Sequence, residues 1–266
     1  MAKYLMGIDA GTGSVRVALF DLRGQNRAYD IQEYSTTYPK NGWAEQSADG
    51  WWSALKKAIP ECIKKSGVNV EDIVALTCDA TTNTIVFMDE NDEMVRTPIL
   101  WMDVRATKEA AEVDKLGKQF AATRFYNPSC RADIMVPKCM WMKKNEPENW
   151  AKTKTLFEFE DWMNWKLTGK KSVCMSIAAF RWNYDDANGG YPIDFYNACG
   201  LEDMVEKFPK DIYRVGEVIG PVSAEAAKEF GLSQKTIVVQ GTADCNACMF
   251  GVGGVKPNGM TLIGGT

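Results

Sequence analysis

Asp9-Ala10-Gly11-Thr12-Gly13-Ser14-Val15-Arg16 is the most informative stretch of this 266-residue sequence. It joins two apolar segments, 4–9 and 14–21, that have the pattern of β-strands. Two glycines let backbone N–H groups turn toward an anion with no Cβ in the way, and Thr12 and Ser14 add hydroxyl donors. The stretch predicts a phosphate-binding loop between two strands, with Arg16 on the strand face of Ser14, where its charge can offset phosphate.

The acidic residue before the turn suits a metal ion. Asp9 ends the first strand, where a carboxylate is a hard oxygen ligand for Mg²⁺ through water. The same residues also fit a plain hairpin turn in which Asp9 and Arg16 form a salt bridge, and a bare Gly-Thr-Gly would favour that interpretation. The ordered set of a strand-end Asp, two glycines, two hydroxyls and an Arg favours phosphate.

The rest of the chain predicts a mixed α/β sheet with helices on its faces. A third strand at 28–35 completes an antiparallel meander, whereas dinucleotide-binding and Walker loops join a strand to a helix. The other expected elements are helices at 47–65, 105–120, 223–230 and 244–250, strands at 73–77, 84–88, 236–240 and 259–263, a loop at 182–192, and a largely helical, Trp-rich insertion at 134–170.

Composition narrows the class of protein. Hydrophobic residues make up 45% and charged residues 25%, which predicts a soluble globular protein, and the net charge of −4 argues against a nucleic-acid partner. No apolar stretch has the length of a membrane span and the first residues lack a signal-peptide pattern, so we expect a cytoplasmic location. The eight dispersed cysteines are expected to be reduced, with Cys245 and Cys248 packing on a helix rather than binding zinc.

The chain contains no histidine. This excludes Ser-His-Asp and Cys-His catalysis and any His-ligated metal within it, so a general base must be Asp, Glu, Lys, Tyr or Cys. Asp244 directly follows the buried strand expected at 236–240 and begins the next helix. From its position alone, Asp244 suits a helix N-cap and a base that orients an attacking hydroxyl about equally well.

The sequence resembles the FGGY carbohydrate kinases along its whole length. The opening Gly7 to Asp21 resembles the phosphate-binding start of that family. Four further segments follow in the family's order: Gly42-Trp43-Ala44-Glu45-Gln46 with Trp51-Trp52, Ile99 to Ala106 with its W-x-D-x-R-A pattern, Gly241-Thr242-Ala243-Asp244 with Gly251 and Gly253, and Pro257 to Thr266.

The resemblance implies an α/β fold of the actin-like ATPase (ribonuclease H-like) type, a mixed β-sheet flanked by helices. It implies ATP and Mg²⁺ as cofactors and Asp244 as the base that accepts the proton of the attacking sugar hydroxyl. Residues 1–266 then form the amino-terminal, sugar-binding and catalytic domain, without the carboxy-terminal domain that holds adenine. The sequence ends at Gly265 and Thr266, where a second phosphate loop is expected to begin, so a truncated form is the simplest explanation, and we expect it to be nearly inactive alone.

A sugar pocket is expected around the segment Asp79-Ala80-Thr81-Thr82-Asn83, whose small polar side chains can serve a polyol. The D-A-T order, and residues 180–184 with 189–192, resemble the ribulokinase-like branch of the family. Thr81, Thr82, Asn83, Trp101, Asp103, Arg181 and Asp244 are therefore the expected substrate residues. Trp101 could equally be a core residue, and Asp103 could pair with Arg105 or cap a helix. Most of Trp141, Trp150, Trp162 and Trp165 are expected to pack helices.

Three functions remain in competition. The first is a kinase for a ketopentose, pentitol or similar polyol. The second is a non-catalytic sugar sensor, which should lack an intact Asp9 loop or Asp244. The third is an actin-like or chaperone-type ATPase, which does not explain Asp244 or the W-x-D-x-R-A segment. The first predicts a small-molecule sugar or polyol as partner, with no nucleic acid or membrane, and leaves a homodimer open.

Overall fold

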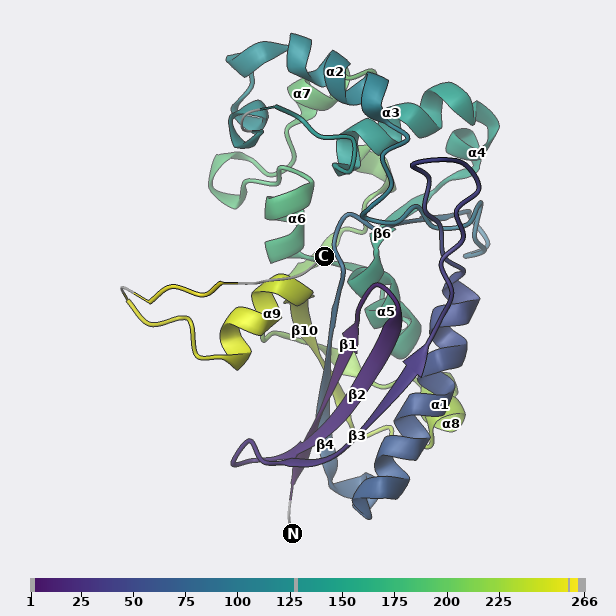
Figure 1. The fold of residues 1–266 in the computed structure, drawn as a ribbon, viewed down its shortest axis with the longest axis vertical. Helices are drawn as coiled ribbons and strands as arrows, with labels where there is room; N and C mark the ends of the chain where they lie inside the picture. Colours follow the sequence, from purple (N-terminus) through teal and green to yellow (C-terminus); the bar gives the residue numbers. More distant parts are fainter. Residues whose placement is uncertain (1–2, 127–128, 258, 263–266) are drawn as a thin grey trace.

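A computed structural model describes residues 3–126, 129–257 and 259–262 (Figure 1). Its centre is a six-stranded sheet with the order β3-β2-β1-β4-β10-β9. The strands β1, β2 and β3 are antiparallel neighbours, β4 and β10 run parallel to β1, and β9 is antiparallel to β10. The strands are β1 (Tyr4–Ala10), β2 (Ser14–Asp21), β3 (Asn26–Glu33), β4 (Ile73–Ala80), β9 (Val218–Pro221) and β10 (Ile237–Ala243).

Alternation of side chains explains how the sheet buries one face. In β1, Met6 and Ile8 are about fully buried while Leu5 is 40% exposed. The helices α1 (Ala48–Ser66) and α5 (Phe159–Thr168) contact this buried face, and α8 (Ala224–Phe230) contacts both helices. Trp51 of α1 stacks on Phe159 of α5, with 3.7 Å between ring centroids. The apolar stripe of each helix and the inward residues of the strands thus form one core.

Local signals set the helix ends. The hydroxyl of Ser47 accepts the backbone N–H of Gly50 at the start of α1, and Gly67 ends the helix with φ of 64°. Ser223 caps α8 in the same way, and Gly169 ends α5 with φ of 75°. These are the capping residues and glycine stops that end helices in general.

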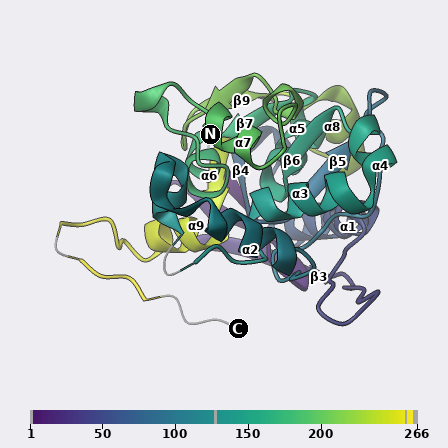
Figure 2. The same cartoon turned by 90° about the horizontal axis from the view of Figure 1, so that it is seen from above.

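A second set of elements lies beyond the carboxyl ends of β1 and β4 and has its own core. Figure 2 shows its helices gathered over that end of the sheet. It comprises α2 (Thr107–Lys115), α3 (Met135–Asn145), α4 (Pro147–Lys152), α6 (Met175–Arg181) and α7 (Ile193–Ala198), the strand pairs β5 (Ile85–Met88) with β6 (Thr155–Glu158) and β7 (Ser172–Cys174) with β8 (Asp211–Tyr213), and 3-10 turns at Gly117–Gln119, Ala121–Phe125, Asp186–Asn188 and Val205–Lys207. A further 3-10 turn, Val70–Asp72, directly precedes β4 at the other end of the sheet.

The last helix, α9 (Asp244–Gly251), lies on the opposite face of the main sheet (Figure 1). There Phe250 and Leu5 line one cavity although both remain partly exposed. None of the helices in the described ranges is long and apolar enough to cross a membrane.

The predicted meander, the mixed sheet and the helices at 47–65, 223–230 and 244–250 are confirmed. The region 134–170 is largely helical, as expected, and also contains the short strand β6. Two expectations were wrong: the helix expected to reach 120 ends at Lys115, and residues 259–262 are not in a strand. Met260 and Leu262 are 90% and 86% exposed, so this apolar segment lacks the neighbouring strand that its backbone would need. Residue 263 lies outside the described residues.

Candidate active site

Three carboxylates meet at the carboxyl ends of adjacent strands. Asp9 on β1 lies opposite Asp79 on β4, and Asp79 lies opposite Thr242 on β10, two residues before Asp244. Parallel strands end at the same edge of a sheet, so topology alone brings these three acids together. The sequence prediction contained Asp9 and Asp244 but did not assign a role to Asp79.

Burial and mutual repulsion set the protonation of this group. The pKa of Asp79 is raised to about 8 by burial and then by the charges of Asp9 and Asp244. Burial also raises the pKa of Asp244, while the backbone N–H of Cys245, 2.6 Å from its Oδ1, lowers it. Asp244 therefore begins α9 with one oxygen bound to the backbone and the other available to a ligand.

The predicted phosphate loop is a tight turn that is held by hydrogen bonds from two side chains outside it. Tyr34 donates its hydroxyl to the carbonyl of Gly11 at 2.5 Å, and Gln46 donates its amide to the carbonyl of Thr12 at 2.6 Å. The Arg16 guanidinium lies 2.7 Å from the Asp9 carboxylate, and both groups are partly exposed. This is the salt bridge that the sequence allowed, and its exposure leaves both charges within reach of a ligand. Tyr34 was missed because no local pattern marks it, and Gln46, although it lies in the segment 42–46 that resembles the family, had been given no role at the loop.

The two glycines of the loop are not demanded by its backbone. Neither Gly11 nor Gly13 has a left-handed φ. A Cβ on Gly11 would meet Arg16 at 3.5 Å, an ordinary contact, and a Cβ on Gly13 would meet nothing within 4 Å. Room for an approaching ligand is therefore the remaining physical reason for glycine at both positions.

The expected sugar segment lies beside the loop. Thr81 donates its backbone N–H to the carbonyl of Ala10 at 3.2 Å, and Thr82 accepts the Nε–H of Arg181 at 2.9 Å. Asn83 is 3% exposed, adopts φ of 59°, and has a buried Oδ1 without a partner among the described residues. A buried acceptor of this kind is what a ligand hydroxyl could satisfy.

Trp101 joins the sugar segment to the phosphate loop. Its indole Nε1 donates to the hydroxyl of Thr12 at 3.0 Å, and its backbone N–H donates to the hydroxyl of Thr84 at 3.2 Å. Lys138, which the sequence did not point to, is fully buried next to this segment. Its ammonium donates to the carbonyls of Asn83 and Leu100 at 2.7 and 2.6 Å. Burial lowers the pKa of Lys138 to about 7.

Asp103 pairs with Arg105, one of the alternatives that the sequence left open. Its side chain has no exposed area, and its oxygens accept the backbone N–H of Ala44 at 2.7 Å and the guanidinium of Arg105 at 2.7 and 2.9 Å. Both oxygens of Asp103 already accept hydrogen bonds from the Ala44 backbone or from Arg105. The structure therefore leaves no free Asp103 oxygen for the expected substrate contact. The W-x-D-x-R-A segment serves to hold the loop at Ala44 against the second core.

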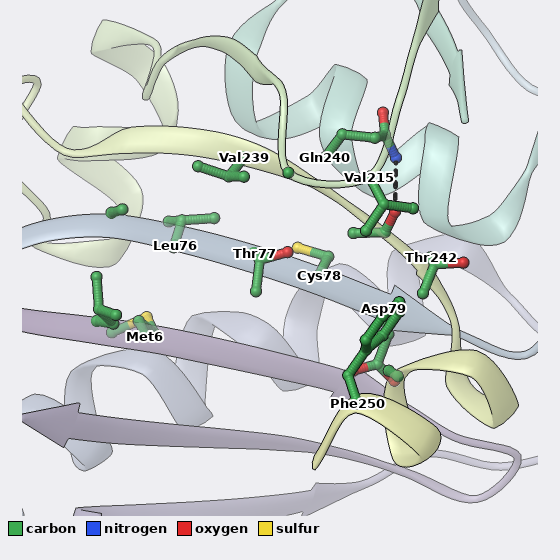
Figure 3. Close-up of a pocket in the computed structure, with 15 residues that line it drawn as sticks. Met6, Leu76, Thr77, Cys78, Asp79, Val215, Val239, Gln240, Thr242 and Phe250 are labelled. Atoms are coloured by element: carbon green, nitrogen blue, oxygen red, sulfur yellow. Dashed lines mark hydrogen bonds between the residues drawn. The ribbon is translucent and has the colours of Figure 1, made fainter. Parts of the chain in front are cut away.

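Two cavities lie near this edge of the sheet, and one of them is lined by Asp79. One of about 420 Å³ on the sheet face away from α1 is lined mostly by apolar residues and ends at Asp79 and Thr242 (Figure 3). The other, of about 1100 Å³, lies between the segment 121–134 and α6 with the loop after it, and Arg181 lines it. Ser176 also lines the larger cavity, and its hydroxyl lies 3.2 Å from that of Thr242. A residue in the wall of the larger cavity thus contacts β10, the strand that directly precedes Asp244.

The structure brings most of the predicted site residues to one edge of the sheet. Asp9, Gly11, Thr12, Gly13, Ser14 and Arg16 form the loop, and Thr81, Thr82, Asn83, Trp101, Arg181 and Asp244 lie around it. Gly265 and Thr266 lie outside the described residues. Of the four tryptophans expected to pack helices, Trp141, Trp150 and Trp162 are buried and Trp165 stacks on Phe157.

Comparison with known proteins agrees with this geometry. The chain is 28% identical to Ribulokinase 2 of Staphylococcus saprophyticus over 99% of its own length and 53% of that protein. It is 28% identical to Xylulose kinase of Bacillus subtilis over 98% of its length and 51% of that protein. The crystal structure of xylulose kinase from Rhodospirillum rubrum superposes with a TM-score of 0.86 at 24% identity, covering 96% of this chain and 52% of that one. The chain thus spans about half the length of the relatives it matches.

The fold is that of the actin-like ATPases, as in these solved sugar kinases. The model of the amino-terminal domain of the FGGY family of carbohydrate kinases matches residues 4–251. The chain therefore belongs to the FGGY family of carbohydrate kinases.

Proposed function

We propose that residues 1–266 are the sugar-binding and catalytic half of a kinase that transfers the γ-phosphoryl group of ATP to a hydroxyl of a ketopentose, pentitol or similar polyol. The observation that carries this proposal is the position of Asp244. It begins α9 at the sheet edge where the Asp9 loop and the Thr81–Asn83 segment also lie, beside a cavity lined by Arg181. The domain that holds adenine would be supplied by a carboxy-terminal half.

In the proposed reaction, the substrate hydroxyl attacks the γ-phosphorus and its proton passes to the free oxygen of Asp244. The bond from the γ-phosphorus to the β-phosphate oxygen breaks, and ADP leaves. Phosphoryl transfer depends mainly on position and charge stabilisation, so the base need only orient the hydroxyl. The N–H groups and hydroxyls of the loop, with Arg16, would bind phosphate oxygens.

Mg²⁺ would neutralise phosphate charge when bound. Among the described residues no group of three acidic or cysteine side chains is arranged to hold a metal by itself. The half-exposed Asp9 carboxylate fits a contact through water, as we expected from its place at the strand end. A cytoplasmic location and a small-molecule partner follow from this function and stay predictions.

The sensor alternative is weakened by an intact loop and an intact Asp244. The discriminating experiment joins this chain to the carboxy-terminal half of a family member and screens ketopentoses, pentitols and tetritols with ATP for ADP release. Turnover of one of them supports the kinase. Tight sugar binding without any turnover would support the sensor instead. The 266-residue chain alone is expected to turn over very slowly, because exclusion of water needs closure of two domains; near-normal turnover by it would contradict the two-half proposal.

A further inference from the structure

Arg181 at the end of α6 presents an unused guanidinium fork to the larger cavity. Its Nε–H is taken by the hydroxyl of Thr82 at 2.9 Å, and its guanidinium lies 3.8 Å from the centre of the Phe180 ring. Within the described ranges, neither of its terminal nitrogens has a hydrogen-bond or ion-pair partner. The group is thus fixed in orientation by two neighbours while its two outer nitrogens remain available.

The other arginines of the described chain behave differently. Those at positions 16, 96, 105, 131 and 214 each form an ion pair with a carboxylate, and those at 23, 27 and 124 are exposed to solvent. Arg131 lines the same cavity as Arg181, and its nitrogens bind Asp133 at 2.6 and 2.8 Å. Arg181 alone among the described arginines is half-buried without a carboxylate bound to it.

No carboxylate among the described residues forms an ion pair with the guanidinium of Arg181. Among the acids, Glu158, which is 1% exposed, has the largest effect on the pKa of Arg181, followed by Asp133, and the charge of Arg181 in turn lowers the pKa of Asp244. Burial raises the pKa of Glu158 to about 8, so this carboxyl is mostly neutral at pH 7. Burial also lowers the pKa of Arg181, as expected of a cation that loses water without gaining a bound anion.

The cavity in front of Arg181 suits a polar chain. At about 1100 Å³ it matches the largest common small-molecule sites, which reach about 1000 Å³. Tyr126, Tyr184 and Asn183 lie in its wall. Asp185 and Asp194 also line it, but their oxygens accept backbone N–H groups of the adjoining turn and helix. The cavity therefore has an unpaired cation at Arg181, and Ser176 in its wall lies 3.2 Å from Thr242, two residues before Asp244.

We propose that the substrate carries a carboxylate at the end remote from the reacting hydroxyl, and that Arg181 binds this carboxylate through its two terminal nitrogens. This inference rests on the proposed function and narrows its substrate to an acidic polyol of the aldonate type. A planar carboxylate accepts two parallel N–H bonds from a guanidinium fork, which a hydroxyl cannot do. The phosphoryl group is then transferred to a hydroxyl at the opposite end, and the carboxylate is unchanged in the reaction.

The test compares matched ligands by calorimetry on the 266-residue chain. The ligands are ribonate, arabinonate, xylonate and lyxonate, each set against the pentitol of the same configuration, with D-ribulose, D-xylulose and D-ribulose 5-phosphate. At least one pentonate is expected to bind about tenfold or more tightly than its pentitol, as a charge-assisted bidentate contact provides. Arg181→Gln is expected to reduce that ratio to near one, and Arg181→Lys to an intermediate value.

Arg131→Gln is the matched control, because Arg131 lines the same cavity but is bound to Asp133; the preference for the pentonate should survive there. Circular dichroism and thermal unfolding establish that each variant is folded. The proposal is overturned if pentitols or pentuloses bind as tightly as every pentonate, if no pentonate binds, if the preference survives in Arg181→Gln, or if the sugar phosphate binds more tightly than the pentonates. Phosphorylation of a neutral polyol by the two-half kinase, with pentonates rejected, would refute this inference while leaving the proposed function intact.

Discussion

The indole nitrogen of Trp101 donates a 3.0 Å hydrogen bond to the hydroxyl of Thr12, across 89 residues of sequence. The bond ties the end of the sugar-side segment to the phosphate loop, so a change in either segment reaches the other through one contact. Core tryptophans also bind an acceptor through the indole N–H, as Trp51 does with Gln46, so it is the position of the acceptor in the phosphate loop that sets Trp101 apart.

Trp101→Phe tests this contact because it keeps an aromatic ring and removes the N–H. A buried neutral hydrogen bond contributes about 1 kcal/mol, so we expect sugar affinity and the KM for ATP in the two-half kinase to weaken by about fivefold. Calorimetry and steady-state kinetics measure the two effects. Trp165→Phe is the control, since Trp165 packs on Phe157 and makes no hydrogen bond through its indole in the described chain. Equal losses in both variants would show that ring packing, not the bond to Thr12, is responsible.

Asp244→Asn tests the base. The amide keeps the shape of the side chain and cannot accept the hydroxyl proton, so kcat in the two-half kinase should fall by about 10²–10⁴-fold. The sugar dissociation constant should stay within about twofold, because hydrogen bonds to the hydroxyl remain possible. Asp49→Asn, on the exposed first turn of α1, is the control and should leave kcat unchanged. Most of the rate surviving in Asp244→Asn would mean that another group is the base.

The sequence predicted the elements whose signals are local. Strand alternation around the Asp9 loop and the caps Ser47 and Ser223 gave the right elements within a few residues. The strand β6 was missed because its four residues, Thr155–Glu158, lie between helices in a region with a helical pattern. Its pairing with β5 is a contact about 70 residues away, which no short window reveals.

The candidate site was predicted where residues follow one another in the chain and missed where they meet through the fold. The loop and Asp244 were found from their flanking strands. Asp79 and Lys138 were not found in this way. The role of Asp79 depends on which strands are neighbours in the sheet, and that of Lys138 on the packing of α3 against the carbonyls of Asn83 and Leu100. Asp103 forms the pair with Arg105 that its motif allowed, whereas its bond to the backbone of Ala44 could not be predicted from that motif.

Glu158→Gln tests the buried carboxyl behind Arg181. The folded-state pKa of Glu158 is about 8, above its ordinary value of 4.5. The folded protein therefore holds a proton that the unfolded chain releases, and the stability contributed by the neutral acid is complete below pH 4.5 and is lost as pH rises through 8. Because glutamine has no proton to lose, the free energy of unfolding of the variant relative to wild type should rise by about 1–3 kcal/mol between pH 5 and pH 8.5.

Urea denaturation across this pH range measures the effect. Glu93→Gln, in an exposed loop, is the control and should show a constant difference from wild type. Asp161, whose pKa burial raises to about 7, stays in both proteins, and because its charge raises the pKa of Glu158 the measured difference includes the interaction of these two carboxyls. A difference that stays flat with pH in Glu158→Gln would mean that the carboxyl is ionised in the folded protein.

Gly241 lies where β10 passes closest to β4, and Gly241→Ala should disturb the base through the backbone. A Cβ at this position would lie 1.8 Å from the carbonyl oxygen of Cys78 and 2.9 Å from the hydroxyl of Thr77. The register of the two strands also shifts between Val239 and Thr242. Since backbone cannot yield as a flexible side chain does, β10 must move away from β4, and overpacking of this kind costs about 2 kcal/mol or more.

Denaturant unfolding is expected to show that loss in Gly241→Ala, and sugar binding should weaken, because Asp244 follows three residues later. Gly251→Ala is the control: it ends α9, has no left-handed φ, and a Cβ there would meet nothing within 4 Å. Alanine in that helix should be neutral or slightly stabilising. If Gly241→Ala were as stable as wild type, the close approach of β10 to β4 would not be a constraint on the position of Asp244.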